Sequence, residues 1–543
     1  MKTNRLIPDF SLRCPVWALA FVVTFFLGVS HTHAASATWN VDGNGSWVTN
    51  ANWSPGAAPG LSSGNTSTDT ATFGATLTAT RNVTVDTTRN IKTIVFDHAS
   101  TGGANYTLVT GGSLRMSPGG LIESVSATGS SSDIDRIMTT TYVDPGSSFT
   151  IRNTGQRSLQ MTYVRGNGTV YLDGNSTSAN NLIGGFNGTG TGGSLVKNGT
   201  GYWKLNNTNN SMPAGVTINA GIFELGNNIA IPSGTSLTMN GGTLQFGLDN
   251  MTISPTMTVG GDFAFASGTS APSFGNATFS GSVDLGGATR VISVVASSTS
   301  GGGGYDPRVF VSGVISNGGL TKAGAGYMVF TGNNTYTGTT TINDGYLVLG
   351  NNGTSGSLGS GAVVTTTGTA LVINRSNALT LNNNISGTGD LAQIGPGATT
   401  LTGNNTYTGD TTVSDGSLIL SDTSRLNFLI QGNGINNAIV GTSTLLMNGT
   451  FSFDLTGADT TYGNSWDIVS MGTLAASYGS SFSVEGFTYG SGNWTYLNGG
   501  KTWTYQESTG VLNVIPEPSV VALVTLTCGG LLFGLRRRRV RRA

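Results

Sequence analysis

The feature that most constrains how this chain can fold is an internal repeat. Residues Leu320–Leu349 read Leu-Thr-Lys-Ala-Gly-Ala-Gly, then Gly-Asn-Asn-Thr-Tyr-Thr-Gly, then Asp-Gly-Tyr-Leu-Val-Leu, and Leu391–Leu420 match them in register. A more divergent copy, one residue longer, occupies Leu195–Leu225. A copy this short cannot bury its own apolar face, so successive copies must stack on one another. The repeat therefore predicts a solenoid.

The secondary structure expected between Ser36 and Val514 is strand throughout. Short apolar segments alternate in period two, as in Val83–Val85, Ile91–Phe96 and Gly242–Phe246, and Gly, Asn or Asp residues bound them. Such alternation indicates strands, whereas a helix would repeat its apolar residues every three to four positions. The chain is therefore predicted to be an all-β, right-handed parallel β-helix.

Within this β-helix, the repeats are expected to lie in one file. We expect the strands that contain Leu320, Tyr346, Leu391 and Ser417 to stack in a single column, with backbone hydrogen bonds running along the rod at ~4.8 Å per layer. Gly and Asn supply the corners, since both tolerate positive φ.

The composition excludes several classes of protein. The chain has 83 glycines and only 9% charged residues, but its 37% of hydrophobic residues argues against disorder. Once the leader and the arginine-rich tail are set aside, acidic residues outnumber basic ones. No nucleic-acid partner is expected, because no basic face is available to neutralise phosphates.

The N-terminus has the features of a secretory signal peptide. Lys2 and Arg5 precede an apolar run at Val16–Val29, and small residues offer cleavage after Ala34 or Ala37. The two cysteines, Cys14 and Cys528, fall in this leader and in the C-terminal tail. The mature body is therefore expected to have neither a disulfide nor a thiol nucleophile.

The C-terminus reads as a membrane tail. Pro516-Glu517-Pro518 precede the uncharged segment Ser519–Leu535, which would form a single transmembrane helix of roughly 25 Å, slightly short of the hydrocarbon core. The arginines that follow are expected to stay on the cytoplasmic side and to place the rest of the chain across the membrane. They are Arg536, Arg537, Arg538, Arg539, Arg541 and Arg542.

This tail resembles the PEP-CTERM sorting signal of bacterial surface proteins. Pro516 and Pro518 disfavour helix and keep the tripeptide extended outside the bilayer. The resemblance implies that Pro516, Glu517 and Pro518 are read by an exosortase, which removes the tail after transient anchoring in the inner membrane. The alternative is a permanent anchor.

The repeat is similar to the autotransporter-associated β-strand repeat of bacterial surface proteins. The similarity covers Leu320–Leu349 and Leu391–Leu420 clearly and Leu195–Leu225 weakly. It implies a β-helical body displayed outside the cell.

Tryptophans concentrate near the two ends of the expected rod. They are Trp39, Trp47 and Trp53 at one end and Trp466, Trp494 and Trp503 at the other. We interpret them as aromatic-rich end caps that cover the exposed cross-section of the solenoid, with stacking on carbohydrate as the alternative.

The sequence offers little for catalysis. His98 is the one histidine beyond the leader region, and no nucleophile motif accompanies it. The best acidic candidate is the pair Asp133 and Asp135, whose spacing puts both carboxylates on one strand face. A solvated loop is the preferred interpretation of this pair, and Asp344 and Asp415 are interpreted as turn formers. No catalytic residue, metal site or cofactor is assigned.

The repeated Asn and Tyr residues allow two interpretations. Asn333-Asn334 with Tyr336, and Asn404-Asn405 with Tyr407, could bind sugar, with the tyrosines as stacking platforms. The preferred interpretation is that they are structural ladders inside the solenoid.

The expected function is that of an exported structural or adhesive protein of the cell surface or extracellular matrix, not an enzyme. Exopolysaccharide is the expected partner, and a polysaccharide lyase or glycoside hydrolase of the β-helix type is the alternative. The expected organisation is a signal peptide at 1–34, an N-terminal β cap and first coils at 35–110, the solenoid at 111–447 with repeats at 195–225, 320–349 and 391–420, a C-terminal β cap at 448–514 and the sorting signal at 515–543.

Overall fold

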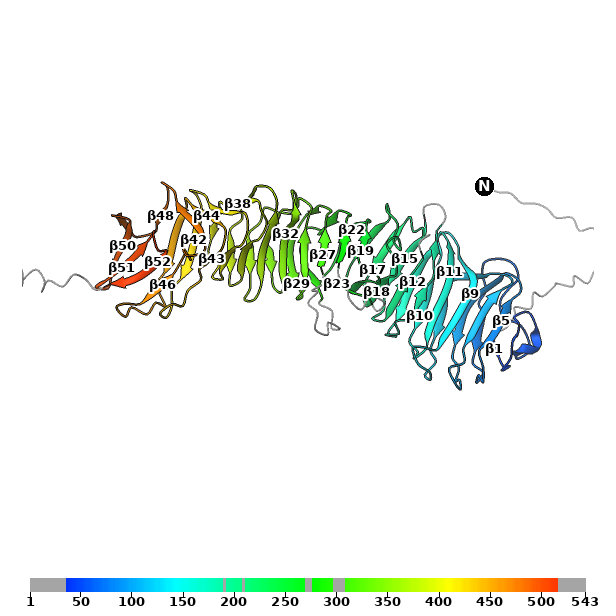
Figure 1. The fold of residues 1–543 in the computed structure, drawn as a ribbon. Coiled ribbons are helices and arrows are strands. Elements are labelled where there is room, and N and C mark those ends of the chain that lie inside the picture. The colour runs from blue at the N-terminus through cyan, green and yellow to red at the C-terminus, as the bar shows by residue number, and fades with distance from the viewer. Residues whose placement is uncertain (1–35, 189–191, 208–209, 269–275, 296–307, 516–543) are drawn as a thin grey trace, which may run out of the picture.

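The computed structural model describes residues 36–188, 192–207, 210–268, 276–295 and 308–515. Figure 1 shows a long rod of stacked strands, with the N-terminal strands at one end and the C-terminal strands at the other. The prediction of an all-β parallel solenoid is confirmed, and its right-handed sense stays a prediction. Apart from strands, the described part has one 3-10 turn, η1 (Asn50–Asn52).

The strands form three parallel columns, one on each side of the rod. Column I contains β1 (Ala37–Trp39), β4 (Thr70–Phe73), β6 (Arg89–Phe96), β8 (Leu114–Ser124), β10 (Ser148–Asn153), β12 (Thr169–Gly174), β15 (Ser194–Lys197), β17 (Gly215–Ile218), β19 (Ser236–Met239), β22 (Thr256–Val259), β25 (Val283–Asp284) and β28 (Ile315–Ser316). In later coils the same side is taken by β35 (Leu379–Leu381), β38 (Ala398–Leu401), β41 (Ser417–Leu420), β44 (Thr444–Met447) and β47 (Ala475–Tyr478).

Column II follows column I in each coil. It contains β2 (Gly45–Ser46), β5 (Arg81–Val85), β7 (Tyr106–Thr110), β9 (Ile134–Val143), β11 (Ser158–Gly166), β13 (Leu182–Ile183), β14 (Phe186–Asn187), β16 (Tyr202–Leu205), β18 (Ile222–Leu225), β20 (Thr243–Phe246), β23 (Phe263–Ser267), β26 (Thr289–Val294), β29 (Gly319–Ala323), β31 (Thr340–Ile342), β33 (Val363–Thr365) and β36 (Ile385–Gly387). This side then continues through β39 (Asn404–Asn405), β42 (Arg425–Leu429), β45 (Thr450–Asp454) and β48 (Ser483–Val484).

Column III completes the coils from the middle of the rod onward. It contains β21 (Met251–Ile253), β24 (Asn276–Phe279), β27 (Arg308–Val311), β30 (Tyr327–Phe330), β32 (Tyr346–Gly353), β34 (Ala370–Arg375), β37 (Asp390–Gln393), β40 (Thr411–Val413) and β43 (Ile439–Gly441). Neighbouring strands of this column pair in parallel throughout.

The prediction that the repeat strands share one column is wrong. Tyr346 and Leu391 lie together in column III, but Leu320 lies in column II and Ser417 in column I. The interval from Leu320 to Leu391 is not a whole number of coils. From Leu320 in column II, successive coils return to that column at β31, β33 and β36, and Leu391 follows one side later, in column III. With Leu195 in column I, the three copies begin on three different sides of the rod.

The core consists of inward-pointing side chains that stack in continuous rows along the rod. In column III, Val309, Met328, Leu347, Leu371 and Leu391 stack in register, and each is at most 1% exposed. Burying a Leu or Val contributes roughly 1.5–3 kcal/mol, and the alternation of the strands sends the intervening side chains outward. Each coil thus buries its inward side chains against those of the preceding coil.

In two copies of the repeat, a buried lysine side chain donates hydrogen bonds to the backbone of the first corner, the turn that follows the first strand of the copy. The Lys322 ammonium donates to the carbonyls of Ala323, Gly324 and Asp344, the last at 2.8 Å in the next coil. Lys197 makes the equivalent bonds in the divergent copy. Burial lowers the pKa of each lysine to about 8. In the third copy Gln393 replaces lysine and its amide donates to two corner carbonyls.

The Asp-Gly pair of the repeat forms the second corner. Gly345 has φ +62°, and a Cβ there would lie 2.6 Å from the carbonyl oxygen of Ala325, so no larger residue fits without a shift. Asp344 accepts a hydrogen bond from the Gly345 amide, and Asp415 accepts one from Gly416, both at 2.8 Å. The interpretation of these aspartates as turn formers agrees with this geometry.

Antiparallel strands and tryptophans cover the N-terminal end of the rod. β1 pairs antiparallel with β3 (Trp53–Ser54), and the rings of Trp39 and Trp47 lie 5.2 and 5.1 Å from that of Trp53. All three indoles are at most 1% exposed. Beside them, Asp42 accepts hydrogen bonds from Arg81 and Thr78, at 2.6 Å from the Arg81 Nε.

The C-terminal end carries a five-stranded antiparallel sheet. Its strands are β46 (Ser465–Asp467), β49 (Thr488–Gly490), β50 (Asn493–Asn498), β51 (Lys501–Gln506) and β52 (Val511–Ile515). The rings of Trp466 and Trp503 stack at 5.5 Å and are at most 1% exposed, whereas Trp494 is partly exposed. The sheet is drawn in orange and red at the end of the rod (Figure 1).

The segments predicted to be a signal peptide, a sorting signal at Pro516-Glu517-Pro518, a transmembrane helix and an arginine-rich tail lie outside the described residues. Among the residues that are described, no helix is long and apolar enough to cross a membrane. Ala37 is the first residue of β1, so cleavage after Ala34 would leave that strand whole.

Candidate functional site

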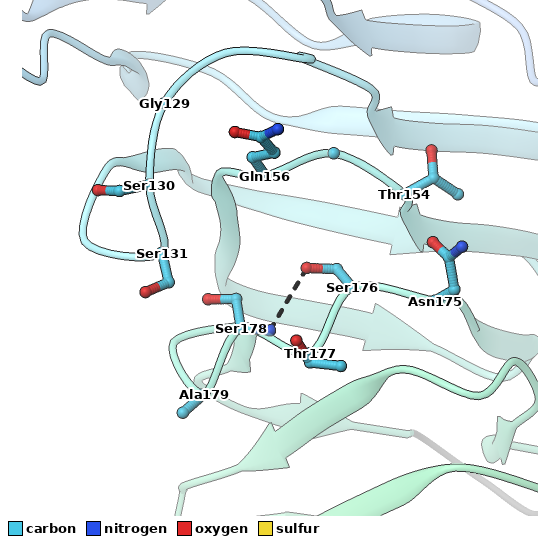
Figure 2. Close-up of a pocket in the computed structure, with 11 residues that line it drawn as sticks. Gly129, Ser130, Ser131, Thr154, Gln156, Asn175, Ser176, Thr177, Ser178 and Ala179 are labelled. Carbon is cyan, nitrogen blue, oxygen red and sulfur yellow. Dashed lines mark hydrogen bonds between the residues drawn. The ribbon is translucent and has the colours of Figure 1, made fainter.

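A pocket of about 600 Å³ opens where three successive coils turn from column I to column II. Its walls are the corner loops that follow β8, β10 and β12 (Figure 2). The lining residues are Gly129, Ser130, Ser131, Thr154, Gly155, Gln156, Asn175, Ser176, Thr177, Ser178 and Ala179. Hydroxyl and amide side chains dominate this list, and it contains no charged or aromatic residue. The pocket is therefore polar but neutral.

The three loops are held to one another by hydrogen bonds. The Ser158 hydroxyl contacts both the Ser131 carbonyl, at 2.6 Å, and the Ser178 hydroxyl, and thus joins the first loop to the third. The Asn180 amide donates to the same Ser131 carbonyl at 2.9 Å. Behind the loops, buried Asn153 donates to Asn181 at 2.6 Å. The walls of the pocket are therefore fixed before any ligand arrives.

Four lining side chains are free to bind a ligand. Thr154, Gln156, Asn175 and Thr177 are exposed, and their side chains make no hydrogen bond to any other described residue. Together they supply two hydroxyl groups and two amides, each of which can both donate and accept. This set matches the hydroxyl groups of a carbohydrate.

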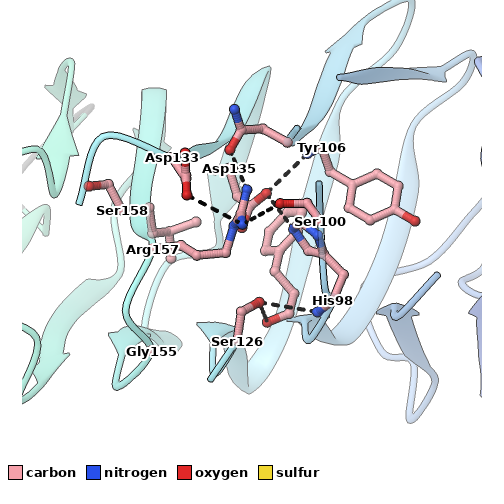
Figure 3. Close-up of polar contacts among 12 residues, drawn as sticks. His98, Ser100, Tyr106, Ser126, Asp133, Asp135, Gly155, Arg157 and Ser158 are labelled. Atoms are coloured by element: carbon pink, nitrogen blue, oxygen red, sulfur yellow. Dashed lines mark hydrogen bonds and ion pairs between the residues drawn. The ribbon is translucent and has the colours of Figure 1, made fainter. Parts of the chain in front are cut away.

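A buried polar cluster supports the floor of the pocket. Arg157 is fully buried, and its guanidinium donates to Ser100, to the Ala104 carbonyl and to Asn105 (Figure 3). Gly129 packs directly on this group, since a Cβ on Gly129 would lie 2.7 Å from a guanidinium nitrogen. Gly129 also has φ +116°. Glycine is therefore required where the first loop crosses the arginine.

The sequence-selected acidic residues belong to this cluster. Asp135 accepts hydrogen bonds from His98 Nε2 at 2.9 Å and from the Tyr106 amide at 3.0 Å. Arg157 lies 3.5 Å from Asp135 and 3.8 Å from Asp133. The interpretation of Asp133 and Asp135 as a solvated loop is wrong for Asp135, whose side chain is 0% exposed.

This burial removes the cluster from contact with a substrate. The side chains of His98 and Asp135 are both 0% exposed. The Tyr106 ring packs edge-on against the His98 ring, with 4.8 Å between the ring centroids, and burial raises the pKa of the Tyr106 hydroxyl. Within the described residues, no group of three or more His, Cys, Asp or Glu side chains could hold a metal ion. The cluster is suited to positioning the loops.

The repeated tyrosines are not sugar platforms. Tyr336 and Tyr407 are 0% exposed, and their hydroxyl groups bond to Thr340 at 2.7 Å and Thr411 at 2.6 Å. Asn334 and Asn405 are buried as well. Each accepts a hydrogen bond from a backbone amide of the preceding coil, that of Ile315 at 2.8 Å and that of Ile385 at 3.1 Å. These asparagines bond neighbouring coils, so the structural interpretation is confirmed. The predicted ladder is wrong, because Asn334 lies on the column I side of the rod and Asn405 in column II.

A second, smaller pocket of about 310 Å³ lies in the later coils. Its lining includes the carboxylates of Asp390 and Asp410 beside Gln431 and Asn436. The Asp410 amide donates to Asp390 at 2.9 Å, and burial raises the pKa of Asp390.

Sequence reasoning missed the larger pocket. The signal that could have found it is the pair of serine-rich loops at 130–132 and 176–178, which lie two coils apart in a part of the rod without repeat character. Their meeting depends on the stacking register, which composition does not reveal.

The fold and the pocket define a class of protein: a capped parallel β-solenoid with a neutral polar groove on one corner. A family model described as the passenger-associated-transport-repeat matches residues 195–225, 320–349 and 391–420. The chain is also 53% identical over 70 residues to the adhesin BmaC autotransporter of Brucella suis biovar 1 (strain 1330), a stretch that covers 13% of this chain and 2% of that protein. No solved structure matches the chain.

Proposed function

We propose that this protein is exported and acts outside the cytoplasm as a structural or adhesive rod that binds polysaccharide without cleaving it. The observation that carries the proposal is the pocket at 129–131, 154–156 and 175–179. It offers exposed hydroxyl and amide groups on fixed loops, and no lining side chain can act as a general acid or base.

The similarities to surface proteins support the location. The passenger-associated-transport-repeat occurs three times, and the Brucella protein with the 70-residue similarity is named as an adhesin. A stiff rod with capped ends can also carry many weak contacts at once, which raises the overall avidity.

For the route to the surface, we propose sorting through the C-terminal tail. Pro516, Glu517 and Pro518 would be read by an exosortase while Ser519–Leu535 and the following arginines hold the chain in the inner membrane. Removal of the tail would release the rod to the cell surface or to an exopolysaccharide matrix. The sequence of this segment supports the proposal.

The experiment for the pocket is a binding measurement with two matched variants. Gln156→Ala with Asn175→Ala removes both amides from the pocket, whereas Asn351→Ala with Asn498→Ala removes two exposed amides elsewhere. We expect the first variant to bind a neutral polysaccharide such as dextran at least tenfold more weakly and the second to bind like the wild type. Equal binding by all three proteins, or no binding by the wild type, contradicts the proposal.

A β-helix lyase or glycoside hydrolase is the competing function. It requires Asp133 and Asp135 to reach a glycan, and the burial of Asp135 speaks against this. Release of shorter glycans that is abolished by Asp135→Ala would establish the enzyme instead.

A further inference from the structure

The outer face of column II beside the pocket has an unusual set of side chains. β9 and β11 begin directly after the loops that line the pocket, so their outward residues continue its surface. On β9 these residues include Arg136, Met138 and Tyr142, and on β11 they include Tyr163 and Arg165. Met138 and Tyr142 are 47% and 37% exposed. Large exposed apolar side chains that lie close together mark an interaction surface more often than apolar side chains scattered singly over a surface.

The register of the two strands brings the aromatic and cationic groups together. Arg165 pairs with Tyr142 in the neighbouring coil, and Tyr163 pairs with Thr140. The Arg165 guanidinium lies 5.5 Å from the centroid of the Tyr163 ring, whose hydroxyl accepts a hydrogen bond from Asn207 at 3.0 Å. The Tyr163 ring is thereby held in place on β11, two residues before the arginine that is in register with Tyr142.

The two arginines of this face carry uncompensated charge. In the described part of the chain, Arg81, Arg115, Arg152, Arg157 and Arg425 form ion pairs with carboxylates. Arg136 and Arg165 form none with a described residue. Arg165 is exposed and Arg136 is partly exposed. A face that keeps two cations unpaired is complementary to an anion.

The face is also long enough for a polymer. Arg136 and Tyr142 lie on the same side of β9, and at ~3.3 Å per residue the strand separates them by roughly 20 Å. Arg165 lies one coil away from Tyr142. Its two arginines therefore meet a partner at separate points, with Tyr142, Tyr163 and Met138 between or beside them.

We propose that this face binds an acidic polysaccharide, with Arg136 and Arg165 pairing with its anionic groups and Tyr142 and Tyr163 contacting the apolar faces of its sugar rings. The proposal rests on the polysaccharide-binding function above and narrows its ligand to a polyanion. Guanidinium groups suit this role because their planar fork of donors matches a carboxylate or sulfate.

The experiment compares Arg136→Gln with Arg165→Gln, introduced together, against Arg308→Gln. Arg308 is the matched control, since it too lies over a tyrosine ring, Tyr327 at 5.1 Å, but on column III. The probes are polygalacturonate, dextran sulfate and neutral dextran at low and physiological salt. We expect the double variant to lose at least tenfold in affinity for the anionic probes, with a weaker salt dependence, and to keep its affinity for dextran.

The outcomes separate this inference from the proposed function. A wild-type protein that binds dextran and both anionic probes equally, or a double variant that binds the anionic probes as the wild type does, overturns the inference alone. Failure to bind any probe overturns the proposed function as well. Binding of dextran sulfate without polygalacturonate assigns the face to sulfated sugars, which the proposal includes. Self-association of the wild type that the double variant loses, without any change in glycan affinity, identifies the face as a protein contact and overturns the inference.

Discussion

Lys322 and Gln393 occupy the same position in two copies of the repeat and bind the same kind of corner. The lysine donates to three backbone carbonyls, and the glutamine donates to those of Gly395 and Gly397 while accepting from Thr399 at 2.7 Å. The two copies thus share a buried hydrogen-bond donor that points at the carbonyl oxygens of the corner, and a different side chain supplies it in each copy.

Changing Lys322 should show this directly. Lys322→Met leaves three buried carbonyls without that donor, and each unmade hydrogen bond of this kind costs about 1–3 kcal/mol. Lys322→Gln should cost distinctly less, because the molecule already uses glutamine at Gln393. Urea unfolding followed by circular dichroism measures both variants. An equal loss for Met and Gln would show that the corner needs the charge and not the donors.

The N-terminal cap should loosen in acid. Hydrogen bonds from Arg81 and Thr78 lower the pKa of Asp42 from 3.8 to about 2. Because the folded pKa is below that of the unfolded chain, the stabilisation is complete above about pH 4 and is lost as the pH falls toward 2. The protection of the amides in the segment 37–54, measured as the hydrogen-exchange rate relative to the intrinsic rate at each pH, should therefore fall over this range in the wild type.

The Asp42→Asn variant provides the control for this pH dependence. It should exchange faster than the wild type at pH 6 and resemble the wild type near pH 2. If the two proteins differ equally at both pH values, the contribution of Asp42 is not carried by its charge.

The C-terminal cap should depend on its tryptophan stack. Trp503→Ala removes a fully buried ring that stacks on Trp466, and large-to-small changes of this kind cost about 3–5 kcal/mol. We expect limited proteolysis to cut within 465–515 well before the earlier coils. Trp494→Ala, at a partly exposed position of the same sheet, should have a smaller effect. Similar protease resistance for both variants would contradict the role of the stack.

The tail makes a separate prediction. Glu517→Ala or Pro518→Ala should leave membrane insertion intact, because neither residue lies in the apolar span, but should block removal of the tail. Replacing the six arginines by Ser should weaken orientation before processing. Mass spectrometry of protein extracted from the cell surface decides between the models. A mature product that still carries Arg536–Arg542 means a permanent anchor.

The sequence predicts the strands and the stacking well, because both depend on local patterns. The two-residue alternation around Leu320 and Leu391 sends these side chains inward, and the Asp-Gly pairs mark the corners. The column of each repeat could not be predicted in the same way. It depends on the lengths of the intervening coils, and nothing in the copies themselves fixes those lengths.

The candidate site was less predictable for a related reason. Asp133 and Asp135 could be selected from their spacing, but the burial of Asp135 depends on Arg157 and His98, which reach it from neighbouring coils. The sequence favours a structural role for Tyr336 and Tyr407 but leaves sugar platforms open as the alternative. Their burial decides between the two, and no strand alternation predicts it because both residues lie outside the strands. The pocket itself consists of residues that are unremarkable one by one.

The most direct test of the account is to mix the mature, surface-extracted protein with the polysaccharide of its own host and follow both by size-exclusion chromatography. The account predicts that the two elute together and that the recovered polysaccharide has its original length, with or without Ca²⁺. Shortening of the polysaccharide, or separate elution of an undiminished polymer and a free protein, would contradict it.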